Sequence, residues 1–134
     1  MKSKVQSVDT SSNRFTDLTG DIGAFVAEQE GDGLVNVFVA HATAGLALIE
    51  TGSGSEEDLA AALDRALPRD ARYVHQHGSP GHGADHVLPA FVSPSVVLPV
   101  VDGSLALGTW QSIVLVDLNR DNPQRKVRFS FVPG

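Results

Sequence analysis

The sequence predicts a single α+β domain that spans residues 1–134 and contains two main helices. Apolar residues recur at helical spacing in two early segments, 17–30 and 55–67. Short apolar runs separated by turn residues fill the later half of the chain. Early helices followed by a late β meander favour the α+β class. A length of 134 residues allows one hydrophobic core and is too short for two.

The first part of the chain is predicted to form an edge strand, a helix and a buried strand. Weak alternation over 4–10 indicates the edge strand, and helical spacing over 17–30 indicates the helix. A Gly-Asp-Gly turn at 31–33 leads into the apolar, β-branched run 34–40, which is typical of a buried strand. The helix is predicted from an apolar stripe and two candidate caps: Ile22, Phe25 and Val26, with Asp17 or Thr19.

A second apolar run and a second helix follow. The run covers 46–49, and the Gly-Ser-rich residues 51–54 predict a flexible loop. Ser55 is the expected N-cap of the helix, since Asp58 follows three residues later as in a capping box. Pro68 is expected to end the helix. Three leucines mark its buried face: Leu59, Leu63 and Leu67.

The later half of the chain is predicted to be mostly β. Residues 73–77 look extended, 78–83 form a loop, and 84–90 form a helical turn limited by Pro89. Asp-Gly at 102–103 is a hairpin turn signal. Alternation or apolar runs predict strands over four ranges: 96–101, 104–107, 110–118 and 126–132.

Composition excludes several classes of function. The net charge is −6 and the pI is about 5.2, which argue against binding nucleic acid or an anionic membrane surface. The chain has no cysteine, so disulfides and thiolate metal sites are excluded. The N-terminal residues lack the apolar core of a signal peptide, and no run reaches transmembrane length. We therefore expect a cytoplasmic location.

Histidines are the main candidates for chemistry. Four of the five, His75, His77, His82 and His86, fall in one polar, glycine-rich window. Three neutral imidazoles leave a fourth coordination position open for water or substrate, as in catalytic zinc sites. Three histidines can instead hold a phosphate or sulfate ion. A solvent-exposed loop without a function is the remaining interpretation.

Three further residues have both a functional and a structural interpretation. His41 follows the predicted buried strand and precedes small residues, which suits either a reaction centre or a structural hydrogen bond. Glu50 is either a general base, a carboxylate that orients a histidine, or a surface residue. Trp110 is expected in the core or an interface rather than against a ligand.

An ordered set of short motifs runs from about Leu34 to Arg128. Together they resemble the YjbQ-like family, whose members are sometimes named secondary thiamine-phosphate synthase enzymes. The matching residues are His41-Ala42-Thr43-Ala44 (family H-T-T-A), Glu50, Asp58, Pro68, Tyr73-x-His75, Ala84-Asp85-His86, Leu98-Pro99-Val100, Gly103, and Leu107-Gly108-Thr109-Trp110-Gln111.

The resemblance implies a sandwich-like antiparallel β-sheet and a homotrimer with sites near the subunit interfaces. It implies that His41, His75 and His86 converge on one site that holds a divalent metal or a bound phosphate or sulfate. Among metals, zinc suits three histidines best. The reaction attached to the family joins a pyrimidine pyrophosphate to a thiazole phosphate, and for this reaction we expect Glu50 to orient a histidine and Arg125 to approach phosphate from a neighbouring subunit. The alternatives are a non-enzymatic trimer that binds a metal or a small phosphorylated molecule, or a trimer whose histidines only fill an interface.

Two departures from the family pattern affect the expected site. Ala42 stands where the family carries a second threonine, which removes one hydroxyl from the pocket. His82 stands where the family carries an asparagine ahead of the last histidine, which adds a possible ligand.

Overall fold

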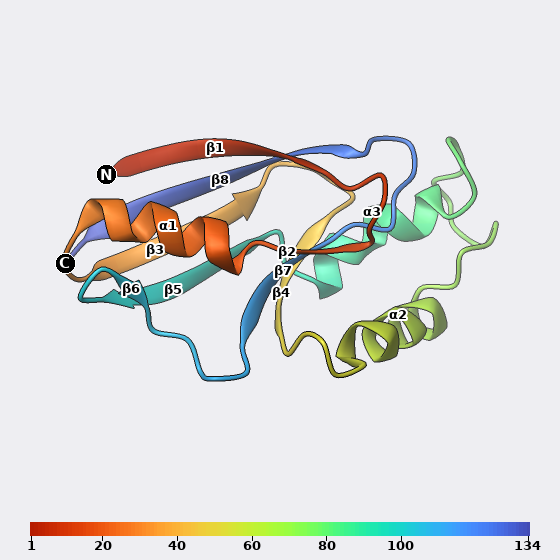
Figure 1. Cartoon of the computed structure of the whole chain (residues 1–134). Helices are drawn as coiled ribbons and strands as arrows, with labels where there is room; N and C mark the ends of the chain where they lie inside the picture. Colours follow the sequence, from red (N-terminus) through yellow and green to blue (C-terminus); the bar gives the residue numbers. More distant parts are fainter.

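A computed structural model describes all residues, 1–134, and contains eight strands and three helices (Figure 1). Every paired strand is antiparallel, and the strands form two sheets, ordered β1-β8-β3-β5-β6 and β2-β7-β4. The predicted α+β class is confirmed, with a third helix added. The elements are β1 (Lys2–Asp9), β2 (Phe15–Asp17), α1 (Thr19–Gln29), β3 (Gly33–Val39), β4 (Gly45–Ile49), α2 (Ser55–Ala66), α3 (His82–Phe91), β5 (Ser95–Val101), β6 (Ser104–Leu105), β7 (Ser112–Val116) and β8 (Gln124–Pro133).

The larger sheet and α1 enclose the main core. α1 lies across one face of this sheet, with the predicted residues Ile22, Phe25 and Val26 buried (Figure 1). The ring centroids of Phe25 and Phe129 on β8 lie 5.8 Å apart. Alternate residues of β3, β5 and β8 point into the same cluster, which contains 17 buried residues. The period of two in these strands therefore places one face of each in the core.

Strand β7 separates this core from a smaller one. Its residues Ile113 and Leu115 belong to the main core, whereas Val114 and Val116 pack with α2 and α3. β7 is the central strand of its sheet and is buried on both faces. The smaller core, which contains six buried residues, places α2 and α3 at one end of the molecule (Figure 1).

Helix ends differ from the predictions in three places. The N-cap of α1 is Leu18, and neither Asp17 nor Thr19. Gly54, with φ at 92°, is the N-cap of α2, and Ser55 is already helical. α3 runs from His82 to Phe91 and is longer than the predicted turn. Pro89 lies in its last turns, where the missing N–H removes one helical hydrogen bond without ending the helix.

The hairpin prediction is confirmed. Of the two positions expected for Trp110, the core is wrong, and an interface stays a prediction. Asp102 and Gly103 have φ of 50° and 72°, as the tight turn between β5 and β6 requires. Trp110 lies in the loop before β7 with 74% of its surface exposed. No helix is long and apolar enough to cross a membrane.

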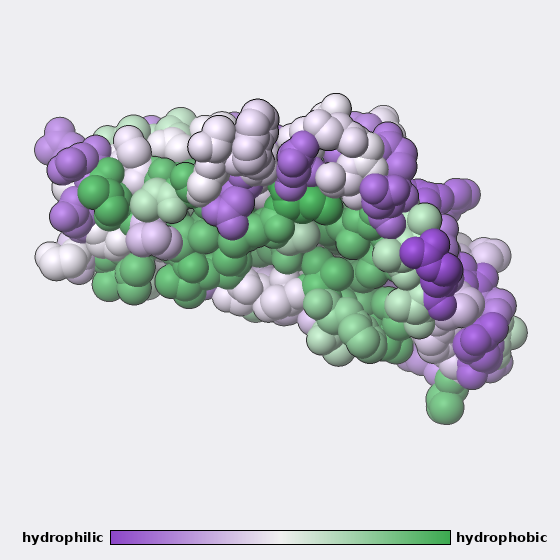
Figure 2. Space-filling view, turned by 90° about the horizontal axis from the view of Figure 1, so that it is seen from below, coloured by the Kyte–Doolittle hydropathy of each residue, from purple (hydrophilic) through white to green (hydrophobic).

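The outer face of the larger sheet also exposes apolar side chains. Cross-strand register places them on one face, opposite to the core. Figure 2 views the molecule from below relative to Figure 1 and shows a band of apolar residues along this lower side. The exposed apolar residues on β3, β5 and β8 are Leu34, Phe38, Val97, Val101 and Val132.

Candidate functional site

The connection between α2 and α3, residues 67–81, forms neither helix nor strand and lies against the start of α3. Its own side chains hold it: the Tyr73 hydroxyl donates to the Pro68 carbonyl at 2.7 Å, and Gln76 Nε2 donates to the Tyr73 carbonyl at 2.6 Å. A Cβ added to Gly83 would lie 2.6 Å from the His75 carbonyl oxygen. Glycine at this position therefore lets the connection approach α3 closely.

Three histidines converge where the connection meets α3. His82 and His86 are one turn apart on α3, and their Nε2 atoms lie 3.0 Å apart. His75 comes from the connection, and its ring centroid is 4.3 Å from that of His86. One potential ligand atom from each of the three lies within 4.8 Å of the others. We call this group the histidine cluster.

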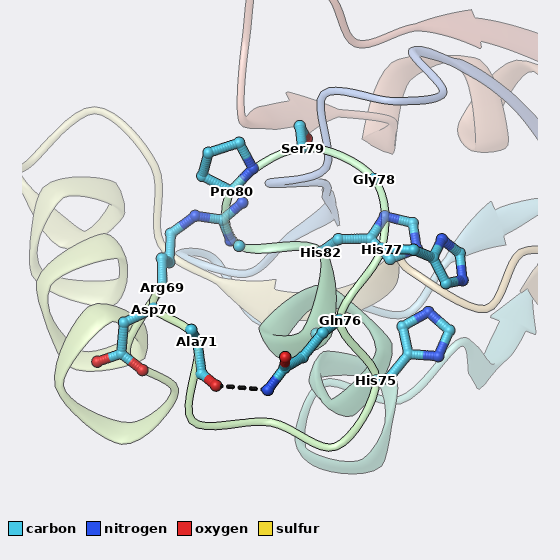
Figure 3. Close-up of a pocket in the computed structure, with 12 residues that line it drawn as sticks. Arg69, Asp70, Ala71, His75, Gln76, His77, Gly78, Ser79, Pro80 and His82 are labelled. Atoms are coloured by element: carbon cyan, nitrogen blue, oxygen red, sulfur yellow. Dashed lines mark hydrogen bonds between the residues drawn. The ribbon is translucent and has the colours of Figure 1, made fainter.

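A fourth imidazole borders the cluster. The His77 ring centroid lies 4.1 Å from that of His75 and 4.6 Å from that of His82. Figure 3 shows His75, His77 and His82 gathered on one side of a cavity. His75 and His77 thus lie side by side, although residues 73–77, which the sequence predicts to be extended, do not form a strand.

Asp121 holds His82 in one orientation. Asp121 lies in the β7–β8 connection, and its Oδ2 is 2.6 Å from His82 Nδ1. A carboxylate accepts hydrogen bonds, so Nδ1 of His82 is the donor in this contact. The hydrogen bonds from His82 and from the Ser79 backbone N–H lower the pKa of Asp121. The orientation directs Nε2 of His82 towards His86.

The electrostatic environment favours neutral histidines. Desolvation lowers the pKa of His75 and of His86, and repulsion from neighbouring imidazoles lowers both further. Neutral imidazole is the form that binds metal ions. The cluster is therefore ready to accept a cation at neutral pH without first losing protons.

A network of hydrogen bonds between buried polar groups holds α3 and the segment that carries Asp121 together beside the cluster. Asp85 of α3 is buried and accepts hydrogen bonds from Arg69 Nη2 at 3.1 Å and from Asn119 Nδ2 at 3.0 Å. Asn119 Oδ1 in turn accepts the backbone N–H of Asp121 at 3.0 Å. Asn119 therefore connects the base of α3 to the residue that orients His82.

A cavity of about 330 Å³ opens beside the cluster (Figure 3). We call it the histidine cavity. The Ser79 hydroxyl in its wall is buried and has no hydrogen-bond partner. A cavity of this volume matches the lower range of small-molecule sites. Its lining residues are Arg69, Asp70, Ala71, His75, Gln76, His77, Gly78, Ser79, Pro80, Gly81, His82 and Gly83.

His41 lies outside the histidine cluster within one chain. It follows β3, and its Nε2 accepts the backbone N–H of Lys126 at 2.9 Å. Burial, and then the positive charge of Arg125, lower the pKa of His41. The structure thus brings together two of the three predicted histidines, His75 and His86, with His82 in place of His41.

Arg125 and Glu50 occupy positions that the sequence did not reveal. The Arg125 side chain is buried and forms hydrogen bonds to both oxygens of Asp117 and, at 2.7 Å, to the Thr43 hydroxyl. The expectation that Arg125 reaches a phosphate in a neighbouring subunit is therefore wrong, because its guanidinium is enclosed in its own chain. Glu50 follows β4 at the end opposite to His41, is half-buried, and stays a prediction.

Asp121 and Asn119 are the site residues that sequence reasoning missed. Asp121 meets a histidine 39 positions away in the chain, and the segment 119–123 carries only the signal of a turn. The sequence does point to His82 as a possible ligand, because it stands where the family pattern has an asparagine.

Comparison with known proteins places the chain in a family. The family described as "UPF0047 protein YjbQ-like" matches residues 3–134. The UPF0047 protein Rv2556c of Mycobacterium tuberculosis is 63% identical over 134 residues, which is 100% of each chain. The UPF0047 protein YjbQ of Salmonella typhimurium is 29% identical over 71% of this chain and 70% of its own.

Solved structures agree with the fold. A YbjQ-like protein from Sulfolobus solfataricus superposes with a TM-score of 0.87 at 25% identity, over 99% of both chains. A protein of the same family from Clostridium acetobutylicum gives a TM-score of 0.85 at 29% identity, over 96% of this chain and 99% of its own. The match across nearly all of the sequence and the shared architecture lead to one conclusion: this chain belongs to the UPF0047 family of YjbQ-like proteins.

Proposed function

We propose that His75, His82 and His86 bind one divalent metal ion, preferably zinc, and that the site acts on a small phosphorylated molecule. The observation that carries this proposal is the convergence of the three ligand atoms within 4.8 Å of one another. Three imidazoles suit zinc, and nickel, copper or iron accept them too. The fourth position would face the histidine cavity.

The surrounding residues fit such a metal. Metal-bound histidines commonly donate their other ring N–H to a carboxylate, which fixes the ring and raises its basicity. Asp121 accepts this hydrogen bond from His82. His77 stands beside the cluster, where it is available as a further ligand or as a contact to the bound molecule.

The reaction suggested by the family resemblance is the joining of a pyrimidine pyrophosphate to a thiazole phosphate. Its transition state expels pyrophosphate, so negative charge develops on the departing oxygens. A divalent metal supplies the positive charge that stabilises such a leaving group. In this chain the remaining requirement, a volume for the substrate next to the histidines, is met by the histidine cavity.

We also propose that the protein acts as a homotrimer. Support comes from the exposed apolar side chains on the outer face of the larger sheet, such as Phe38 and Val97. Soluble monomers rarely expose large apolar patches. In this proposal His41 and Glu50 reach a histidine cluster only across a subunit interface, because in one chain His41 contacts the backbone of Lys126.

One observation favours a binding protein without catalysis. The carboxylates near the cluster and its cavity are already engaged: Asp121 accepts from His82 and Ser79, Asp85 accepts from Arg69 and Asn119, and Asp70 accepts from Arg72. A carboxylate that acts as general acid or base must be free to exchange a proton with substrate. In this second candidate the same histidines hold a metal or a phosphorylated metabolite and no turnover follows.

The proposal is tested in two steps. Metal-free protein is first titrated with zinc by calorimetry, for the wild type and for His86→Ala. Zinc-loaded protein is then given the pyrimidine pyrophosphate and the thiazole phosphate, and pyrophosphate release is measured. Stoichiometric zinc binding with pyrophosphate release supports the enzyme, and zinc binding without release supports a metal-binding protein. No zinc binding contradicts the metal site in both candidates and leaves only a protein that binds a phosphorylated metabolite. In the last case the cluster is titrated with phosphate as an anion site.

A further inference from the structure

A second cavity, of about 420 Å³, lies between the β1–β2 and β7–β8 connections, apart from the histidine cavity. None of its lining residues belongs to the histidine cavity. We call it the arginine cavity. Its lining residues are Thr10, Ser11, Ser12, Asn13, Arg14, Asp117, Leu118, Asn119, Arg120 and Pro123.

Two arginines without protein partners line this cavity. Arg14 comes from the β1–β2 connection and Arg120 from the β7–β8 connection. Neither guanidinium takes part in an ion pair, whereas Arg69, Arg72 and Arg125 each pair with an aspartate. Arg14 and Arg120 therefore bring two positive charges to one cavity. They leave a local excess of positive charge.

The one carboxylate in the lining does not cancel this charge. Asp117 is buried, and its Oδ2 accepts from Arg125 Nε and from the Thr10 hydroxyl, both at 2.6 Å. Its Oδ1 accepts from Arg125 Nη2 at 2.8 Å and from the Asn119 backbone N–H at 3.0 Å. The charge of Asp117 is therefore balanced by Arg125 behind it, and its acceptor positions are filled.

The remaining lining supplies neutral donors. Ser11, Ser12 and Asn13 lie on the same connection as Arg14 and are exposed. The side chain of Ser11 hydrogen-bonds to Asp9, whereas those of Ser12 and Asn13 have no such partner. Hydroxyl and amide groups beside guanidinium groups are the donors that phosphate oxygens accept in proteins. The planar fork of each arginine matches two oxygens of a phosphate group.

We infer that the arginine cavity binds the phosphate group of a phosphorylated small molecule, with Arg14 and Arg120 as the two charged donors. The buried network of Asp117, Arg125 and Thr10 fixes the floor of the cavity. The cavity is therefore already formed before a ligand binds. This inference is independent of the histidine cluster, because it uses none of the cluster's residues.

The test is binding of inorganic phosphate and of pyrophosphate to metal-free protein at low ionic strength, measured by calorimetry and by amide NMR shifts. We expect Arg14→Ala and Arg120→Ala each to weaken binding by about tenfold, as expected for the loss of a charge-assisted hydrogen bond. Arg65→Ala is the matched control, because Arg65 is exposed on α2 and lies outside the cavity. The affinity of Arg65→Ala for phosphate and pyrophosphate should equal that of the wild type.

His75→Ala separates this inference from the proposed metal site. Phosphate binding that persists in His75→Ala and falls in both arginine variants supports the arginine cavity, whatever happens to metal binding. Phosphate binding that is lost in His75→Ala and unchanged in Arg14→Ala and Arg120→Ala overturns the inference. An absence of phosphate binding by wild-type protein at millimolar concentration also overturns it. Both arginines are exposed, so these variants should keep the fold, which circular dichroism checks.

Discussion

The two ends of this molecule are stabilised in different ways. The end with the larger sheet and α1 has a continuous core of 17 buried residues, drawn mainly from regular strands. The end with α2 and α3 has a core of six, and its connection 67–81 has no regular structure. There, side-chain hydrogen bonds such as those of Asp85, Asn119 and Tyr73 hold the chain in place.

This difference implies that the residues that stabilise the fold and the residues that could bind a ligand lie at different ends of the molecule. Apolar burial is roughly proportional to area and stabilises the sheet whatever its precise residues. Polar side chains held by directional hydrogen bonds can instead be placed where a ligand needs them, and rigid scaffolds commonly carry such loops. Variants of the sheet end should therefore change folding, and variants of the histidine end should change binding.

The largest effect is expected from Phe129→Ala, at the centre of the main core. Phe129 is fully buried and packs on Phe25. Removing its ring should lower the free energy of unfolding by about 4 kcal/mol, through lost burial and a remaining cavity. Urea unfolding measures this. Phe91→Ala, at a side chain that is 70% exposed, is the control and should stay within about 0.5 kcal/mol of the wild type. Equal losses in both variants would contradict the assigned core.

The next effect is expected from Arg125→Met, which leaves the buried Asp117 without its ion-pair partner. An uncompensated buried charge should lower the free energy of unfolding by about 3 kcal/mol. Arg128→Met is the control, since Arg128 is exposed on the neighbouring part of β8. A stable Arg125→Met protein would show that Asp117 is accessible to water or protonated.

Asp121→Asn should act on binding and leave folding nearly unchanged. Loss of the carboxylate that orients His82 should weaken zinc binding by roughly 10- to 100-fold. The free energy of unfolding of the metal-free protein should change little, because Asp121 is exposed. Asp64→Asn, at an exposed aspartate of α2 outside the histidine cavity, is the control for zinc affinity. Identical zinc affinities for the two variants would remove Asp121 from the site.

The smallest effect is a dependence of stability on pH. His75 and His86 have pKa values below the ordinary 6.5, so the unfolded chain binds protons more readily than the folded one. In metal-free protein, the stability that neutral His75 and His86 contribute is fully present above pH 6.5. It is lost as the pH falls through the pKa values of these histidines in the folded protein. Urea unfolding at pH 7.5 and 5.5 should show lower stability at the acidic pH, with a smaller difference in His86→Ala. Higher stability at pH 5.5 would contradict the assigned environment.

Much of the fold could be predicted from the sequence because alternation and helical spacing report burial directly. Ile22, Phe25 and Val26 are buried on α1 as predicted, and Asp102-Gly103 forms the predicted hairpin turn. The length of α3 was underestimated, since Pro89 was expected to limit the helix and instead lies within its last turns. The short strand β2 has only three residues, too few for a periodic pattern.

The site was harder to predict than the fold because it depends on contacts across the chain. His75, His82 and His86 are close in sequence, and this proximity predicts a shared site. The position of His41 depends on its pairing with Lys126, 85 residues away, and that of Asp121 on His82, 39 residues away. Neither contact follows from local spacing, which therefore carries no sign of Asp121. The expectation that His41 joins His75 and His86 comes from the family resemblance and stays a prediction.

The most direct test of the central claim is the metal content of untagged protein, measured by mass spectrometry. Wild type, His75→Ala and His82→Ala are compared, with His77→Ala as the variant of a neighbouring histidine outside the three-ligand group. We predict about one zinc ion per chain in the wild type and in His77→Ala, and loss of the ion in the other two. Wild-type protein without metal, or metal kept in both His75→Ala and His82→Ala, would contradict the account.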